Sequence, residues 1–172
     1  MRTSWNDGDR YSGQSDVPTL TGHGIHQAYQ LARVLEESRL VSKIVCSDLR
    51  RAQQTALILA GPYGLEPVVD LRLRELAIGH MDGMGAAARA VFADPYLSTH
   101  HPNYNFTSIG GESREQVIRR HQEAFDEHVT DEGICLFVGH GTSLRTFLES
   151  CGVTEPIVQG GFVQLLYRKT EA

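Results

Sequence analysis

Hydrophobic residues follow two kinds of pattern along this chain, short apolar runs and stretches with helical spacing. The apolar runs predict β-strands at 43–46, 67–69, 134–138 and 163–167. The helical spacing predicts helices over 24–38, 49–60 and 113–129, and another from Ser143 onward. Because strands and helices alternate, the sequence predicts an α/β fold, a three-layer sandwich whose mostly parallel sheet is flanked by helices.

Polar segments connect these elements. Residues 1–21 are rich in Gly, Asp and Ser, show no period and are expected to form a loop. Residues 79–111 are mixed and predict a short helical piece near 86–92 within a lid or surface excursion. Ser47 and Asp48 directly precede the second helix, and we expect them to cap it.

Length and charge limit the classes of partner. A chain of 172 residues with 41% hydrophobic content fits one domain over residues 1–172. A formal net charge of -5 argues against nucleic acid or an anionic membrane as the main partner. The three cysteines form no CxxC pair and are odd in number, which favours a reducing, cytoplasmic location without disulfides or a zinc site.

One histidine stands at a position that suits an anion. His140 lies between Gly139 and Gly141, at the end of an apolar run and at the start of a helical stretch. In open α/β sheets this edge binds anionic ligands, because the helix N-terminus offers unpaired N–H groups. A phosphate is the expected ligand, and a satisfied core histidine is the alternative interpretation.

Charged residues follow the other two strands. Arg50 and Arg51 lie on the first turn of a helix, where a cation is unfavourable unless an anion is near, so at least one is expected to face a ligand or a carboxylate and the other solvent. Glu75 follows the 67–69 strand and taken alone fits a surface carboxylate. Together with His140 these residues indicate one pocket that combines a stabilising imidazole, a phosphate clamp and a proton donor.

Several motifs resemble the histidine phosphatase superfamily, also called phosphoglycerate mutase-like, over nearly the whole chain. They are Trp5-Asn6, residues 10–18, residues 46–56, Leu73-Arg74-Glu75 with Gly79 and Gly83, residues 110–113 and residues 138–141. In that family one histidine attacks the phosphorus and becomes a phosphohistidine. A second histidine and an arginine stabilise the transferring group, and a carboxylic acid protonates the leaving oxygen.

The resemblance implies a role for each candidate residue. His140 corresponds to the second histidine, Arg51 to the helix arginine and Glu75 to the proton donor. It further implies that the phosphate or substrate contacts Asn6, Ser12 and Gly13 in the first loop, and the backbone of Gly141 and Thr142.

The chain departs from the family pattern at its start. Met1 stands where the family has the glycine of an Arg-His-Gly triplet, so the nucleophilic histidine and the first strand are missing from the sequence. None of the seven other histidines follows an apolar strand in this way. The chain as it stands is therefore expected to be inactive or impaired and to lack a central strand.

Three explanations stay open. The natural protein carries the missing segment, and the start is an internal methionine or a truncation. Alternatively, the chain is a pseudoenzyme that binds phosphorylated ligands or a protein partner. In the third, another strand fills the gap, either from the first loop or from a second copy in a homodimer.

The expected activity of a complete chain is hydrolysis of phosphate monoesters without metal or other cofactor, on a small phosphorylated metabolite. A phosphoglycerate mutase-type phosphotransferase is the alternative, because residues 139–145 resemble the mutase form of the motif. His100 and His101, in a loop with Pro102, are given no role.

Overall fold

The computed structural model describes residues 1–7, 10–37, 40–85, 94–130, 133–153, 159–164 and 166–167. The helical piece predicted near 86–92 lies outside these residues. No helix in the described ranges combines the length and hydropathy needed to cross a bilayer.

The sheet contains three parallel strands in the order β2-β1-β3. They are β1 (Val41–Cys46), β2 (Val68–Val69) and β3 (Ile134–Val138). Val45 in β1 pairs with Val68 on one side and with Phe137 on the other. This confirms the predicted parallel sheet, with β1 as the central strand of the described part.

Four helices match the periodic stretches to within two residues. They are α2 (Gly22–Glu36), α3 (Arg50–Ala60), α4 (Arg114–His128) and α5 (Gly141–Ser150). A one-turn helix, α1 (Ser4–Asp7), interrupts the segment predicted as loop. Single 3₁₀ turns occur at η1 (Gly61–Tyr63), η2 (Leu71–Leu73), η3 (Gly79–Met81) and η5 (Thr107–Ile109).

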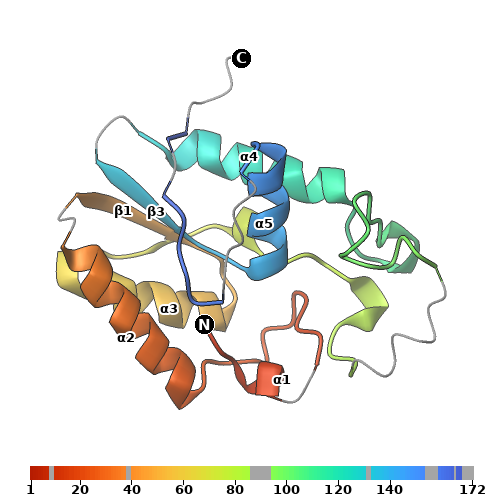
Figure 1. Cartoon of the computed structure of the whole chain (residues 1–172), viewed down its shortest axis with the longest axis horizontal. Helices are drawn as coiled ribbons and strands as arrows, with labels where there is room; N and C mark the ends of the chain where they lie inside the picture. The colour runs from red at the N-terminus through yellow and green to blue at the C-terminus, as the bar shows by residue number, and fades with distance from the viewer. Residues whose placement is uncertain are drawn as a thin grey trace.

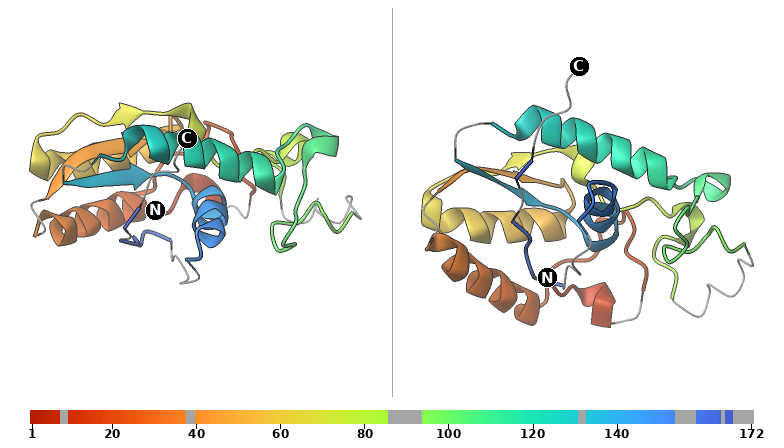
Figure 2. Two further views of the ribbon diagram at one scale, coloured as in Figure 1. Left: turned by 90° about the horizontal axis from the view of Figure 1, so that it is seen from above. Right: turned by 45° about the horizontal axis from the view of Figure 1, so that its top comes forward.

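The helices cover both faces of the sheet. Successive side chains of a strand point to opposite faces, so Ile44 packs with α3 and its neighbour Val45 packs with Phe125 of α4 and Phe147 of α5. Helix α2 packs against α3, and α5 against α4 (Figures 1 and 2). The result is the predicted three-layer α/β sandwich.

The strand predicted at 163–167 is wrong for the residues described there. Val163, Gln164, Leu166 and Tyr167 have no strand pairing, and in the view of Figure 1 the segment crosses β3 at an angle. A cavity of about 1190 Å³ is lined by both β3 and this segment. A ladder requires a neighbouring backbone about 4.8 Å away, and none of the three described strands pairs with these residues.

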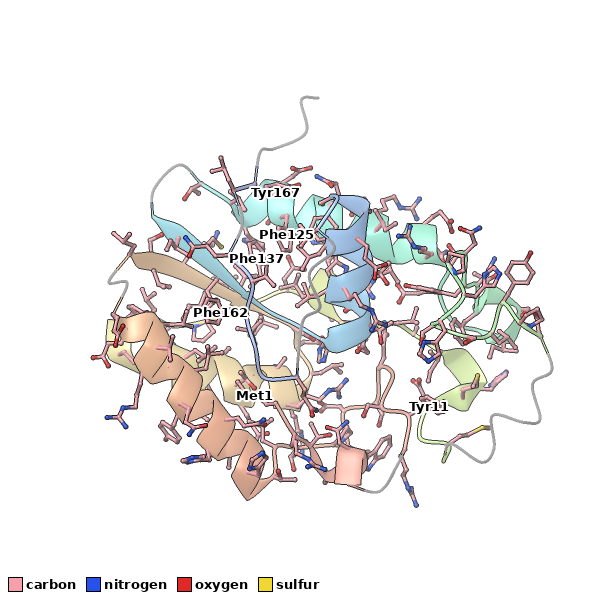
Figure 3. The ribbon with its side chains drawn as sticks, viewed as in Figure 1. Met1, Tyr11, Phe125, Phe137, Phe162 and Tyr167 are labelled. Atoms are coloured by element: carbon pink, nitrogen blue, oxygen red, sulfur yellow. The ribbon has the colours of Figure 1, made fainter. Side chains whose placement is uncertain are left out.

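Side chains anchor this C-terminal segment instead. The Tyr167 hydroxyl donates to Asp126 at 2.9 Å, and its ring centroid lies 5.4 Å from that of Phe125. Phe125 also stacks on Phe137 of β3, with ring centroids 3.8 Å apart (Figure 3). Aromatic packing therefore closes the end of the molecule where backbone pairing is absent.

The predicted cap of α3 is also wrong. The N-cap residue is Leu49, and the first-turn donor Arg50 N binds the Asp16 carboxylate at 2.6 Å. The Ser47 hydroxyl accepts from Leu49 N, and Asp48 forms an ion pair with Arg74 at 2.5 Å. A carboxylate 34 residues away in sequence thus supplies the cap, which local sequence reasoning does not reveal.

A buried carboxylate joins the end of β2 to α4. Asp70 Oδ2 lies 2.9 Å from His128 Nε2 and 2.6 Å from Arg72, which also binds Glu127. Burial acts to raise the pKa of Asp70, but hydrogen bonds from Arg72 and His128 outweigh it and lower the pKa to about 2. The folded chain therefore favours the ionised form of Asp70.

Replacing Asp70 is expected to produce a pH-dependent loss of stability. The pKa of Asp70 is about 3.9 in the unfolded chain and lower in the folded chain. Ionised Asp70 therefore stabilises the folded chain above pH 4, and this stabilisation is lost as the pH falls towards 2. We expect Asp70→Asn to lower the free energy of unfolding at pH 7 by about 1–2 kcal/mol. Urea unfolding between pH 2 and 7 measures this difference.

Glu127→Gln, on the exposed partner of Arg72, is the control and should change stability less. A loss for Asp70→Asn that is the same at pH 2 and pH 7 would contradict the assignment.

Candidate active site

His140 links β3 to α5 and is the N-cap residue of that helix. Gly139 before it packs tightly, since a Cβ there would lie 2.9 Å from Leu144 Cδ1. The imidazole is only 8% exposed, and its buried Nε2 has no hydrogen-bond partner among the described residues. Buried polar atoms are nearly always paired, so Nε2 is suited to bind a ligand.

Glu75 rests on the first turn of α5. Its Oε1 accepts from Ser143 N at 2.8 Å, and its Oε2 accepts from Thr142 N at 3.3 Å. Leu76 N also donates to Oε1, at 2.8 Å. The carboxylate therefore occupies the anion-binding end of the helix, where the resemblance places the phosphate.

Arg51 is the buried arginine of the pair on α3. It is 8% exposed and donates to the carbonyls of Ser15 at 2.7 Å and Gly13 at 2.9 Å. Burial lowers its pKa, and the negative charges of Glu75, Asp16 and Asp82 oppose that shift. The side chain of Arg50 is 69% exposed and pairs with Asp16, as the sequence predicted for one of the two.

The electrostatic environment keeps His140 neutral. Burial lowers its pKa well below the ordinary value, and Arg51, Arg120, His121 and the chain N-terminus lower it further. A neutral imidazole whose Nε2 carries the proton donates a hydrogen bond without requiring a second buried positive charge. A bound anion would act in the opposite direction and favour the protonated ring.

One cavity collects most of the predicted site residues. The cavity of about 1190 Å³ beside β3 is lined by Asn6, Ser12, Arg51, Glu75, His140, Gly141 and Thr142. Gly13 does not line it, and instead its carbonyl holds Arg51. The Asn6 side-chain oxygen accepts from Thr3 N and from Gln159 Nε2. The structure thus brings the three catalytic candidates to one edge of the sheet, while their roles stay predictions.

Two residues that the sequence analysis missed hold Glu75 in place. The Arg120 guanidinium donates to the carbonyls of Arg72 at 2.6 Å and Arg74 at 2.7 Å, and pairs with Glu112 at 2.7 Å. Glu112 in turn accepts from Ala77 N at 2.9 Å. Arg120 and Glu112 therefore clamp the segment on both sides of Glu75. Glu112 belongs to the 110–113 motif, but its spacing from Arg120 in the sequence does not predict the ion pair between them.

In the described parts of the chain, no three His, Cys, Asp or Glu side chains converge in a way that would hold a metal ion. The lining of the cavity includes instead Arg51, Arg145 and His140, and the first-turn N–H groups of α5 hold the Glu75 carboxylate at its edge. This donor set suits the oxygens of a phosphoryl group.

The model of the histidine phosphatase superfamily (branch 1) matches residues 2–156. The chain belongs to this superfamily. The matched residues include all the residues that line the large cavity, except Met1 and the lining residues after 156.

Relatives within the histidine phosphatase superfamily carry both phosphatase and mutase names. The chain is 46% identical over 151 residues to "Probable phosphoglycerate mutase GpmB" of Yersinia pestis (strain Pestoides F), covering 86% of this chain and 69% of that protein. It is 32% identical to a mycobacterial glucosyl-3-phosphoglycerate phosphatase solved with VO3, with a TM-score of 0.76 over 87% of this chain and 76% of that one. A solved protein from Thermus thermophilus, TTHB049, is 28% identical, with a TM-score of 0.66 over 92% and 85% of the two chains.

The position of Glu75 predicts competition with phosphate. Glu75→Gln removes a negative charge from the helix N-terminus, so inorganic phosphate should bind about three- to tenfold more tightly. This change corresponds to about 0.7–1.4 kcal/mol of binding free energy. Isothermal titration calorimetry measures the affinity. Glu127→Gln, which removes a charge at the far end of α4, should leave the affinity unchanged. Weaker binding to Glu75→Gln would show that the carboxylate does not compete for this position.

Proposed function

We propose that residues 1–172 form the phosphoryl-binding site of a metal-independent phosphomonoester phosphatase of the phosphohistidine type. The main support is the buried Nε2 of His140, which lacks a hydrogen-bond partner among the described residues and lines the same cavity as Arg51. An oxyanion of the phosphoryl group would satisfy this atom and balance the charge of the guanidinium.

Each residue has a distinct part in the proposed reaction. The phosphoryl group binds at the start of α5, where His140 and Arg51 stabilise its oxygens as negative charge moves during transfer. Its arrival displaces the Glu75 carboxylate from the N–H groups of Thr142 and Ser143. Glu75 takes up a proton from solvent and donates it to the leaving oxygen as the bond between that oxygen and phosphorus breaks and the nucleophilic histidine bonds to phosphorus.

The nucleophile is assigned by the resemblance alone. No histidine within residues 1–172 matches the nucleophile of the family, so turnover is proposed for a chain that carries an apolar strand and Arg-His-Gly directly before residue 2. The mycobacterial relative named glucosyl-3-phosphoglycerate phosphatase supports hydrolysis of a small phosphorylated metabolite.

Two forms of the chain test the reaction, residues 1–172 and an extended form in which an apolar strand ending in Arg-His-Gly replaces Met1 and directly precedes residue 2. The extended form should hydrolyse p-nitrophenyl phosphate equally well with and without EDTA. The 1–172 form should be slower by a factor of at least about 10³, because it lacks the nucleophile. Equal rates in the two forms would refute the assignment of the nucleophile.

Substitutions in the extended form test the stabilising groups. His140→Gln and Arg51→Gln should each lower kcat by about 10²–10³, the usual cost of losing one donor to the transition state. Arg50→Gln is the matched control, because it removes the exposed arginine next to Arg51 and should keep kcat within twofold. Circular dichroism confirms that each variant is folded. Unchanged kcat in His140→Gln would remove the main support for the proposal.

Phosphoglycerate mutase-type transfer is the second candidate function. It is favoured by the 46% identity to a relative named as a mutase and by the mutase-like form of residues 139–145. The ratio of phosphoglycerate isomerisation to phosphate release in the extended form separates the two activities. Phosphate binding without either activity would support the pseudoenzyme alternative.

A further inference from the structure

Two fully buried polar side chains lie next to the candidate active site. Among the described residues, the buried side-chain N and O atoms that have no hydrogen-bond partner belong to Tyr63, His121, His140 and Ser143. His140 is part of the proposed phosphoryl site, and Tyr63 lies in η1, beyond the end of α3. The side chains of His121 and Ser143 are both 0% exposed and have no part in the reaction described above. Because buried polar atoms are nearly always paired, these two require an explanation.

The two side chains lie on helix faces that pack against each other. Helix α4 packs on α5, and the buried residues are His121 on α4 and, one helical turn apart on α5, Ser143 and Phe147. The His121 ring stacks on that of Phe147, with centroids 5.8 Å apart and 24° between the planes. Side chains of a helix lean towards its N-terminus, so the Phe147 ring covers the turn that carries Ser143. His121 therefore faces this turn from α4.

Both residues are connected to Glu75. Its Oε1 accepts from Ser143 N at 2.8 Å. The Arg120 guanidinium donates to the Glu75 carbonyl at 3.2 Å and comes within 3.5 Å of His121 Nδ1. Positive charge on His121 also acts to lower the pKa of His140. His121 thus belongs to the surroundings of the site, although it does not line the cavity that contains His140.

The two unpartnered atoms have complementary hydrogen-bonding character. His121 Nδ1 lies 2.9 Å from the Val117 carbonyl, which only accepts, so Nδ1 carries the proton. The Arg120 contact at 3.5 Å is beyond the usual range of a hydrogen bond. Burial, followed by the charge of Arg120, lowers the pKa of His121 to about 4, so Nε2 keeps its lone pair at neutral pH. The Ser143 hydroxyl is the matching donor.

We propose that His121 is a positioning residue of the phosphoryl site, whose Nε2 accepts a hydrogen bond from the Ser143 hydroxyl through one buried water molecule. A bridging water satisfies both atoms, because neither reaches a protein partner among the described residues. The link fixes the first turn of α5 and thereby aims the N–H groups of Thr142 and Ser143. Donors that are held in place before the ligand arrives need no reorganisation when it binds. The role of His121 rests on the proposed function, in which the phosphoryl group binds to this turn.

Phosphate binding to residues 1–172 tests this role without any need for turnover. His121→Phe keeps a ring against Phe147 but removes Nε2, and Ser143→Ala removes the hydroxyl but keeps the backbone N–H. Each variant should bind inorganic phosphate about three- to tenfold more weakly than wild type in isothermal titration calorimetry. The double variant should bind no more weakly than the weaker single variant, because both changes break the same link.

Two further variants separate positioning from packing. His121→Gln places an amide group near the position of Nε2, so it should recover most of the lost affinity, to within twofold of wild type. Tyr63→Phe is the matched control, because it removes another buried unpartnered group outside the lining of the large cavity and should leave the affinity unchanged. Urea unfolding measures the stability of each variant. Ser143→Ala tests the link independently of how well His121→Phe folds.

The outcomes separate the two proposals. If His121→Phe and Ser143→Ala bind phosphate as wild type does, the positioning role is wrong and the phosphoryl site stands. The same conclusion follows if their losses add in the double variant, or if His121→Gln binds as weakly as His121→Phe. If wild type binds no phosphate, the phosphoryl site itself is wrong and the role of His121 is overturned with it.

Discussion

The contact between the Glu75 carboxylate and the first turn of α5 connects the parts of this site. It joins the segment after β2 to the helix after β3, through hydrogen bonds from Thr142 and Ser143. Arg120 and Glu112 hold the same segment from its other side. Because the carboxylate also acts on the buried charge of Arg51, this one contact links the backbone of the site to its electrostatics.

The strongly periodic parts of the sequence were sufficient to predict the sheet and its helices. Apolar runs identified β1 and β3, and helical spacing identified α2 to α5. The rule that ligands bind at the carboxyl ends of parallel strands predicts one pocket for Arg51, Glu75 and His140, and all three line the same cavity. These inferences succeeded because each depends on residues close in sequence or on a general property of α/β sheets.

The errors share a physical cause, which is contact between distant segments. The cap of α3 comes from Asp16, and the clamp on Glu75 comes from Arg120. The segment 163–167 has the composition of a strand, but pairing requires a neighbouring backbone within reach. Propensity describes what a segment is able to form, whereas the surrounding structure decides whether it does so.

The outer edge of β3 has a consequence for how the protein behaves in concentrated solution. In the described part of the chain β3 pairs only with β1, and its other side borders the large cavity. A strand edge whose N–H and C=O groups are not used by a neighbour acts as a template for other strands. Apolar side chains such as Leu136 and Phe137 line the same opening. The opening beside His140 therefore combines an unpaired strand edge with apolar side chains, the two features by which one strand recruits another.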